Sequence, residues 1–253
     1  MTSTRIIAIA NQKGGVGKTT TAINLGTSLA MNNKEVLLVD FDPQVNATTG
    51  MGLRPDEGPA IDDLLLGRET AGTVVEETMV EGLHVVPGSR ALSGLEIELA
   101  TVENREFLLK ESLESFRGYY DFVLIDCPPS LGLLTINALV AAGEVLVTLQ
   151  SEYYALEGLS HLMETIRNVR RLWNPELDIT GVLLTMVDSR LNLSREVKKE
   201  VGHFLGDRMF KTFIPRNVKL SEAPSFGVPA LLHDARSKGA LSYLDLAREV
   251  ISR

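Results

Sequence analysis

Residues 13–20 read Lys13-Gly14-Gly15-Val16-Gly17-Lys18-Thr19-Thr20 and follow directly on an apolar run at 6–10. This order predicts a buried strand, a glycine-rich turn and a helix that begins in the turn. Glycines let successive backbone N–H groups point toward phosphate oxygens, and the helix N-terminus adds its positive end to the same place. Lys18 can reach the β- and γ-phosphates of a nucleotide, and the Thr19 hydroxyl can bind Mg²⁺. The stretch therefore predicts a site for a nucleoside triphosphate.

This loop departs from the ordinary Walker A pattern. Gln12 stands five residues before Gly17, where that pattern has glycine, and Lys13 is a second lysine beside the loop. Taken alone, Lys13 is a solvated surface lysine. The alternative is that it supplies positive charge across a subunit interface to phosphates held by a second chain. An arginine finger does this in other NTPases, where the effect is worth roughly 10³–10⁵ in rate. A site completed only in a dimer would link nucleotide state to association.

Continuous apolar runs recur along the 253 residues and alternate with helical patterns. The runs predict strands at 6–10, 35–40, 83–87, 122–126, 145–149, 179–185 and 209–214. Residues 158–173 carry one apolar stripe at helical spacing, and the stretch 50–82 is the least regular, so we expect loops and short helices there. The alternation predicts an α/β fold, a doubly wound, mostly parallel sheet with helices on both faces. Nothing resembles a linker or a repeat, so we expect one domain over residues 1–253.

The composition limits the class of protein. With 44% hydrophobic and 23% charged residues, the chain has the balance of a globular protein. The net charge of −8 means that any contact with nucleic acid must come from a local basic patch. The single cysteine, Cys127, excludes an intrachain disulfide and a cysteine-rich metal site within one chain. No signal-peptide pattern opens the sequence, and no apolar run reaches the ~18 residues of a membrane-spanning helix. We expect a cytoplasmic protein.

Three carboxylates follow two of the predicted strands. Ligands of such sheets bind beyond the carboxyl ends of the strands. Asp126 ends an apolar strand as a Walker B aspartate does and is predicted to hold Mg²⁺ through water; alternatively it caps the next turn. Asp40 and Asp42 point to opposite faces if the strand continues, so we expect different roles. Asp42 would orient the attacking water and approach the metal through water, unless it only forms an Asp-Pro turn. Asp40 would support the water shell of the metal, or Lys18.

Several segments together resemble the ParA/MinD group of ATPases. Residues 13–19 resemble its deviant Walker A motif, and residues 40–44 resemble its first switch region. Residues 126–132, 152–158 and 214–225 resemble the chromosomal ParA (Soj) branch. The likeness runs from about residue 5 to the end of the sequence and is weakest over 50–82. It covers nearly the whole chain.

The resemblance implies a slow ATPase that uses ATP and Mg²⁺ and forms a homodimer with ATP between the subunits. The dimer would bind double-stranded DNA without sequence preference and associate with the nucleoid. A centromere-binding partner of the ParB (Spo0J) type would stimulate hydrolysis and release the protein. Whether the cargo is a chromosome or a plasmid stays open.

Site residues also follow from the resemblance. Lys13 would be the signature lysine, and Asp42 the aspartate needed for hydrolysis. Phosphates and Mg²⁺ would be bound by the loop residues Gly14, Gly15, Val16, Gly17, Lys18, Thr19 and Thr20, and by Asp40 and Asp126. Pro215, Arg216 and Asn217 would lie against the adenine.

DNA contact would come from a group of basic residues. Arg190 and Lys219 match basic positions that the family uses for DNA, and Arg195, Lys198 and Lys199 extend the group. The alternative is a solvated helix face, partly neutralised by Glu196 and Glu200. DNA binding without sequence preference needs only charge pairs between basic side chains and phosphates. A dimer would present two copies of this group of basic residues.

Two positions depart from the family pattern. Val45 stands where the family usually has glycine after Asp-Pro-Gln. If that backbone needs a positive φ, Val45 is strained, or the loop takes another path. Lys219 stands where close relatives often have arginine, which keeps the charge but loses the planar fork.

Three other kinds of ATPase compete with this interpretation. A MinD-like membrane-cycling ATPase would need a basic amphipathic helix at the end of the chain. Residues 240–251 have an apolar face, but only Arg248 and Arg253 near it are basic, so we expect a core helix. An electron-transfer ATPase of the nitrogenase iron-protein type needs two cysteine ligands per subunit, and one is present. A biosynthetic, ligase-type relative would need a carboxylate or amine substrate for ATP turnover.

Overall fold

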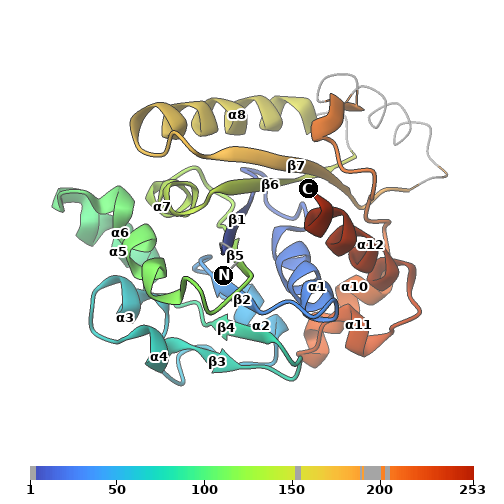
Figure 1. Cartoon of the computed structure of the whole chain (residues 1–253), viewed down its shortest axis with the longest axis horizontal. Helices are drawn as coiled ribbons and strands as arrows, with labels where there is room; N and C mark the ends of the chain where they lie inside the picture. The colour runs from blue at the N-terminus through green and yellow to red at the C-terminus, as the bar shows by residue number, and fades with distance from the viewer. Residues whose placement is uncertain (1–3, 152–154, 189, 191–200, 203–205) are drawn as a thin grey trace.

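The computed structural model describes residues 4–151, 155–188, 190, 201–202 and 206–253. This part of the chain forms a seven-stranded sheet in the order β3-β4-β2-β5-β1-β6-β7 (Figure 1). The strands are β1 (Arg5–Ala10), β2 (Val36–Asp40), β3 (Glu76–Glu77), β4 (Leu83–Val86), β5 (Phe122–Asp126), β6 (Glu144–Gln150) and β7 (Asp178–Thr185). The β3–β4 pair is antiparallel, and the other strand pairs are parallel. The doubly wound, mostly parallel sheet is therefore confirmed.

Helices cover both faces of the sheet. The helices are α1 (Lys18–Ala30), α2 (Asn46–Gly50), α3 (Ile61–Leu65), α4 (Ala71–Val74), α5 (Leu92–Glu98), α6 (Leu108–Leu113), α7 (Leu133–Ala141), α8 (Ala155–Leu172), α10 (Val218–Glu222), α11 (Ala230–His233) and α12 (Lys238–Ser252), with 3₁₀ turns η1 (Leu99–Thr101), η2 (Arg105–Phe107), η3 (Glu114–Phe116), η4 (Gly206–Arg208) and η5 (Ala223–Phe226). Figure 1 shows α7 and α8 on one face and α1 and α12 on the other. Each face has its own apolar core.

The central strands are apolar because both of their faces are covered. Every residue of β2 and β5 is buried, so alternate side chains enter the two cores. In the ladder, Asp40 pairs with Asp126, and Ile9 near the end of β1 also pairs with Asp126. Three strand ends that are distant in sequence thus meet at one edge of the sheet. This edge is where the sequence predicts a ligand.

The predicted strand at 209–214 is wrong as a continuous strand. The segment lies beside β7 and forms isolated parallel bridges, Met209 with Val182 and Pro215 with Val187. Between these bridges, the N–H groups of Lys211 and Thr212 donate to the Glu249 carboxylate, at 2.9 and 3.0 Å. A side chain of α12 therefore takes ladder positions that a strand would fill.

The stretch 50–82 holds short helices and loops, as expected, and also the edge strand β3. Its two residues, Glu76 and Glu77, are exposed and pair with β4. A two-residue acidic strand carries no apolar signal, so the sequence could not predict it.

The helix expected at 240–251 is the core helix α12. Tyr243, Leu246 and Val250 are buried in the core that α12 shares with α1. Within the described residues, no helix combines the length and the apolar character needed to cross a bilayer.

Candidate functional site

The loop after β1, residues 11–17, turns at two glycines whose backbone is in the left-handed region, and we call this loop the arch. Gly15 has φ 72° and Gly17 has φ 85°, a region that only glycine enters at no steric cost, and α1 begins at the next residue. Val16 is buried at the base of the arch, where its carbonyl accepts a hydrogen bond from Thr185 Oγ1 at 2.8 Å. The Asn11 side chain accepts the N–H of Lys13 at 2.9 Å. The sheet therefore fixes the loop from below, through polar contacts that the sequence motif does not reveal.

Lys18 folds back across the arch. Its side chain is 6% exposed, and Nζ donates to the carbonyl of Lys13 at 3.2 Å. Burial lowers the pKa of Lys18, while the nearby Asp126, Cys127 and Asp42 act in the opposite direction. A buried ammonium with only part of its bonding capacity used is well placed for an anion.

Asp126 is a buried carboxylate with spare bonding capacity. It is fully buried, and neither of its oxygens accepts a well-formed hydrogen bond from the described residues. Burial, and then the charge of Asp40, raise its pKa well above the usual range; the nearby Thr19 hydroxyl and Lys18 lower it less. Such a group is costly unless a cation balances it. The arrangement fits a divalent cation beside Thr19.

Asp40 is bound differently, although it pairs with Asp126 in the sheet. Its Oδ2 accepts the N–H and the hydroxyl of Thr48, at 2.8 and 2.7 Å, and Oδ1 accepts the N–H of Asp42 at 3.4 Å. Burial raises the pKa of Asp40 to about 6, against the effect of the Thr48 bonds. The Thr48 hydroxyl also accepts the N–H of Gly88 at 2.8 Å. Asp40 therefore ties α2 to the end of β2.

Asp42 lies between this tie and the loop. It is 6% exposed, and its Oδ1 accepts the N–H of Gln44 at 3.0 Å, an Asx turn. Its charge lies close enough to Lys18 to act on the pKa of that ammonium. The Asp-Pro turn of the alternative interpretation is thus present, and Asp42 is also a neighbour of the site.

Val45 adopts the backbone that its residue type avoids. Its φ and ψ are 51° and 33°, in the left-handed region, and its side chain is 1% exposed. Its N–H donates to the carbonyl of Asp42 at 2.9 Å, and its own carbonyl accepts from Thr49. Of the two possibilities that the sequence left, the loop keeps the positive φ, at a cost of roughly 1–2 kcal/mol for a residue with a Cβ.

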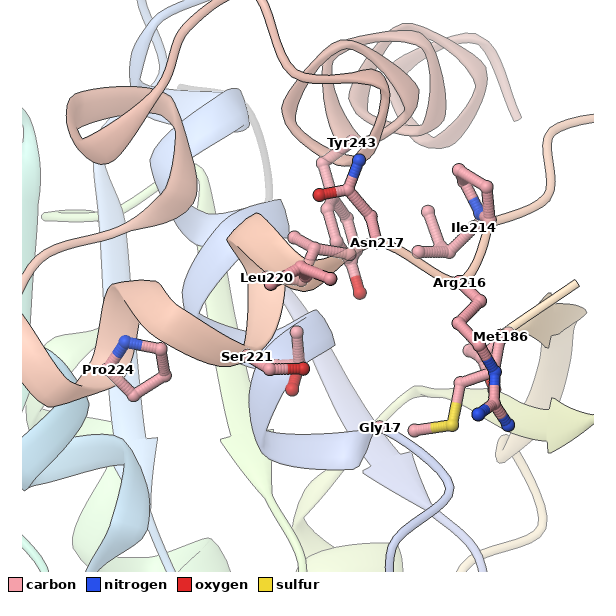
Figure 2. Close-up of a pocket in the computed structure, with 13 residues that line it drawn as sticks. Gly17, Met186, Ile214, Arg216, Asn217, Leu220, Ser221, Pro224 and Tyr243 are labelled. Atoms are coloured by element: carbon pink, nitrogen blue, oxygen red, sulfur yellow. The ribbon is translucent and has the colours of Figure 1, made fainter.

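A cavity of about 530 Å³ adjoins the loop (Figure 2). Pro215, Arg216 and Asn217 line it, as do Gly17 and Thr20. Asn217 is the N-cap of α10, where its side chain accepts the N–H of Lys219 at 2.8 Å. A pocket with one largely apolar wall and the phosphate loop at its edge has the character of a nucleobase site.

Outside the segment 214–225, sequence reasoning missed three residues that line this cavity, namely Thr185, Met186 and Tyr243. Met186 directly follows β7 and has φ 52°, a second strained position beside the loop. Tyr243 comes from α12 and lies within 3.1 Å of the Thr21 hydroxyl, oxygen to oxygen. None of the three belongs to a phosphate-loop motif; only the apolar stripe of residues 240–251 hinted that α12 is buried.

Of the residues predicted to contact DNA, the structure describes Arg190 and Lys219. Arg190 is exposed and forms an ion pair with Asp188, with 2.7 Å between Nη2 and Oδ2. Lys219 lies on α10 and forms an ion pair with Glu222, with 2.9 Å between Nζ and Oε2. Arg195, Lys198 and Lys199 lie outside the described residues.

Within the phosphate loop, three residues are exposed on the surface, namely Lys13, Gly14 and Gly15.

The described residues contain no group of three or more His, Cys, Asp or Glu side chains that could enclose a metal ion. A cation beside Thr19 and Asp126 would therefore take most of its ligands from water and from a bound phosphate. This is the way in which Mg²⁺ is usually held at phosphate-transfer sites.

Comparison with known proteins agrees with this geometry. A family model described as an AAA domain matches residues 4–179. The sporulation initiation inhibitor protein Soj of Bacillus subtilis (strain 168) is 54% identical, over 97% of this chain and 98% of its own. The chromosome partitioning protein ParA of Caulobacter vibrioides (strain NA1000 / CB15N) is 53% identical, over 98% of this chain and 94% of its own. Cobyrinic acid a,c-diamide synthase from Mycobacterium smegmatis, solved with bound ADP and magnesium, is 38% identical, with a TM-score of 0.86 over 97% of this chain and 93% of its own.

The identity over nearly the full length of both chains extends far beyond the phosphate loop. It agrees with the resemblance that the motifs indicated. This chain therefore belongs to the ParA/Soj family of chromosome-partitioning ATPases.

Proposed function

We propose that this chain is a Mg²⁺-dependent ATPase that partitions DNA. The observation that carries the proposal is the buried Lys18 beside the buried, unsatisfied Asp126, under a glycine arch at the edge of a base-sized cavity. The identities of 54% and 53% with Soj and ParA support the partitioning role.

In this proposal each site residue has a distinct task. The N–H groups of Gly14 to Gly17 and the Lys18 ammonium bind the phosphates, and Pro215 to Asn217 contact the base. Thr19 and Asp126 hold Mg²⁺, with water between Asp126 and the metal; when bound, Mg²⁺ neutralises phosphate charge. Asp42 orients the attacking water, and Asp40, which Thr48 holds in place, positions Asp42 by accepting its N–H.

The proposal includes an ATP-bound homodimer. Lys13 and the adjacent glycines are exposed at the outer edge of the arch, where a second copy could approach. There Lys13 would add positive charge to the phosphates of the partner subunit. Association would then follow the nucleotide state.

In the dimer, Arg190 and Lys219 would contact DNA phosphates, and a ParB-type protein would stimulate hydrolysis. Both side chains are exposed enough to exchange their carboxylate partner for a phosphate. Because the net charge is −8, binding has to use such local positions.

Molar mass measured by light scattering tests this proposal. Asp42→Ala should bind ATP without hydrolysing it and accumulate as a dimer, because water is no longer oriented for attack. Lys13→Ala should bind ATP but stay monomeric. Asp245→Ala, which removes an exposed carboxylate on α12, is the matched control for Asp42→Ala. An Asp42→Ala protein that hydrolyses ATP at the wild-type rate and stays monomeric would contradict the proposal.

A second candidate function follows from the 38% identity with the cobyrinic acid a,c-diamide synthase structure. In that case ATP turnover would depend on a small carboxylate substrate and not on DNA. Measuring phosphate release with DNA and a ParB-type protein, against cobyrinic acid with an amine donor, separates the two functions.

A further inference from the structure

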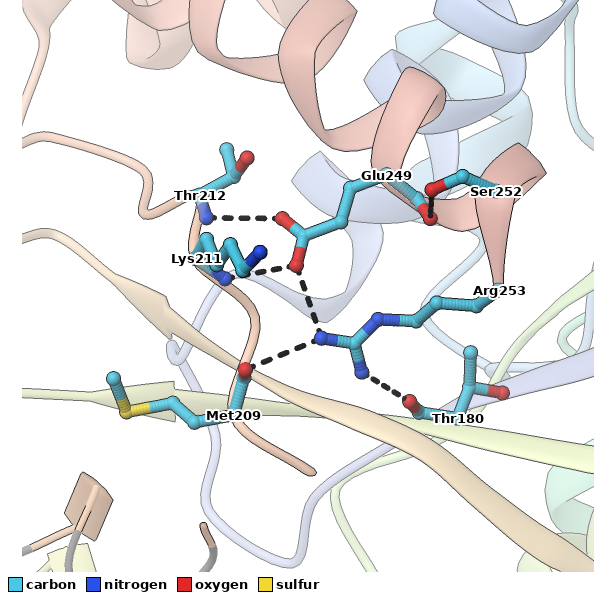
Figure 3. A network of polar contacts seen from close by, with 7 residues as sticks. All are labelled: Thr180, Met209, Lys211, Thr212, Glu249, Ser252 and Arg253. Atoms are coloured by element: carbon cyan, nitrogen blue, oxygen red, sulfur yellow. Dashed lines mark hydrogen bonds and ion pairs between the residues drawn. The ribbon is translucent and has the colours of Figure 1, made fainter. Parts of the chain in front are cut away.

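Glu249 of α12 and Arg253, the residue that follows this helix, both bind the segment that leads into the base pocket (Figure 3). Arg253 donates from Nη1 to the carbonyl of Thr180 at 2.6 Å and from Nη2 to the carbonyl of Met209 at 3.2 Å. Nη2 also donates to Glu249 Oε1 at 2.9 Å. We call Glu249 and Arg253 the α12 clasp. It joins β7, α12 and the segment 209–212 at one point.

Glu249 holds the segment through its backbone. Its Oε1 and Oε2 accept the N–H groups of Lys211 and Thr212, and its side chain is 15% exposed. Burial tends to raise the pKa of Glu249, but the bonds from Lys211, Thr212 and Arg253 outweigh it and lower the pKa. An ionised carboxylate therefore replaces the strand partner that residues 211 and 212 lack.

β7 is shaped to admit the clasp. The ladder with β6 skips Thr180, so its carbonyl is out of register and accepts from Arg253. The next residue, Gly181, leaves room that a side chain would fill. A Cβ there would lie 2.6 Å from Phe210 Cε2 and 2.7 Å from Arg253 Nη1. The Arg253 guanidinium stacks over Phe210, 4.2 Å from the ring centroid.

The clasp joins the two elements that form the walls of the base pocket. One wall is the segment Ile214 to Asn217, which follows the gripped residues directly. The other includes Tyr243, which lies six residues before Glu249 on the same helix. Beyond the clasp, the N–H of Ile214 donates to the carbonyl of Leu184 in β7, and the N–H of Arg216 donates to the carbonyl of Val187, two residues after this strand. The clasp thus closes a frame around the pocket.

We propose that Glu249 and Arg253 are positioning residues for recognition of the nucleotide base. Neither residue lines the base pocket, so they act by fixing the separation of the segment 214–217 from α12. The inference rests on the proposed ATP binding at the same site. It predicts that the clasp affects binding of the base but not binding of the phosphates.

Calorimetric titration of the full chain with Mg²⁺-ATP and with Mg²⁺-tripolyphosphate separates these two contributions. Glu249→Ala should lower the affinity for ATP by roughly tenfold, which corresponds to about 1.4 kcal/mol. The affinity for tripolyphosphate should stay unchanged. Glu249→Gln keeps one acceptor oxygen and should lie between Glu249→Ala and the wild type. Arg248→Ala removes an exposed arginine of α12 that pairs with Asp245, and serves as the control.

Gly181→Ala tests the clasp from the other side, because it displaces Arg253 and Phe210 without changing a charge. It should lower ATP affinity in the same selective way. Unchanged ATP affinity in all these variants would overturn the inference, and so would an equal loss for ATP and tripolyphosphate, which would indicate general destabilisation. If the wild type bound tripolyphosphate and ATP equally, the base pocket itself would be wrong. If it bound neither, the proposed function would fail first.

Discussion

Thr48 donates both its backbone N–H and its hydroxyl to the same carboxylate oxygen of Asp40, at 2.8 and 2.7 Å. The Asp40 carboxylate therefore has hydrogen-bond partners in its own chain, whereas Asp126, its neighbour across the β2–β5 ladder, accepts no well-formed hydrogen bond from the residues that the structure describes. Two adjacent carboxylates thus have different surroundings. The surroundings of Asp40 fit a carboxylate that connects β2 to α2. Those of Asp126 fit a carboxylate that binds a cation.

Replacing Asp126 tests this difference. Because the pKa of Asp126 is raised, its charged form opposes folding at neutral pH, so Asp126→Asn should stabilise the protein without nucleotide. A gain of about 1 kcal/mol would raise the Tm by roughly 2–4 °C for a chain of this size. The pKa of Asp40 is raised as well, but an amide nitrogen cannot accept the N–H of Asp42, so Asp40→Asn should gain less stability than Asp126→Asn.

Thermal denaturation at pH 7.5, with and without Mg²⁺-ATP, measures both effects. Asp126→Asn should also lose the part of the ATP-induced stabilisation that depends on Mg²⁺. A lower Tm for Asp126→Asn without nucleotide would mean that this carboxylate already has a partner in the folded chain.

Replacing Val45 tests the strained backbone. At a normal buried position, Val→Gly is less stable than Val→Ala by roughly 0.5–1 kcal/mol. At φ 51° alanine keeps the left-handed cost and glycine removes it, so Val45→Gly should be at least as stable as Val45→Ala. Val39, fully buried in β2, is the control and should show the normal order. Urea denaturation gives the free energy of unfolding of the glycine and the alanine variant at each of the two positions. If the glycine variant were the less stable one at position 45 as well as at position 39, strain at Val45 would be excluded.

Lys18→Ala should abolish tight ATP binding. The substitution removes the buried ammonium and its bonds to the phosphates, a loss on the order of 100-fold in affinity. Lys238→Ala removes an exposed lysine at the start of α12 and should bind ATP normally. Calorimetric titration checks both variants, and unchanged affinity in Lys18→Ala would exclude the phosphate-binding role.

Glu222 should limit DNA binding through Lys219. Its carboxylate accepts from Lys219 Nζ, and a phosphate would have to displace it. Glu222→Gln should therefore strengthen ATP-dependent DNA binding, by roughly two- to fivefold as for an exposed ion pair, and should do nothing in a Lys219→Ala background. Fluorescence anisotropy measures the DNA affinity in the wild-type and the Lys219→Ala background. If Glu222→Gln raised this affinity equally in the two backgrounds, the DNA contact would lie away from Lys219.

The pH dependence of stability should reveal the α12 clasp. Because the pKa of Glu249 is lowered on folding, its contribution is complete above the unfolded value of 4.5 and is lost as pH falls through the lower folded value. The Tm difference between wild type and Glu249→Gln should be constant from pH 8 to 5 and shrink below 4.5. A constant difference down to pH 3 would contradict a charged Glu249.

The sequence was enough to predict the sheet and the phosphate loop, because both depend on local patterns. Buried strands such as β2 and β5 are unbroken apolar runs, and the arch needs glycine at positions 15 and 17. The segment 209–214 was misassigned for the opposite reason. Its apolar pattern suits a strand, but Glu249, far along the chain, takes its N–H groups.

The supporting contacts of the site could not be predicted for the same physical reason. Thr185 binds the carbonyl of Val16, and Tyr243 lines the base pocket, through contacts between segments that are distant in the sequence. Thr48 lies only eight residues after Asp40, but its bonds depend on how α2 packs against the end of β2. Val45 was recognised as unusual from the family pattern alone. Whether its φ was positive depended on how α2 packs, which one sequence does not determine.

Control of DNA binding by the nucleotide can be measured with the wild-type protein and non-specific duplex DNA, in the presence of ATP or of ADP and over a salt series. We expect tight binding with ATP only, with a log–log salt slope that grows by about 0.9 for each phosphate neutralised. Equal binding with ATP and ADP, or no binding with ATP, would contradict a nucleotide-controlled DNA partitioning ATPase.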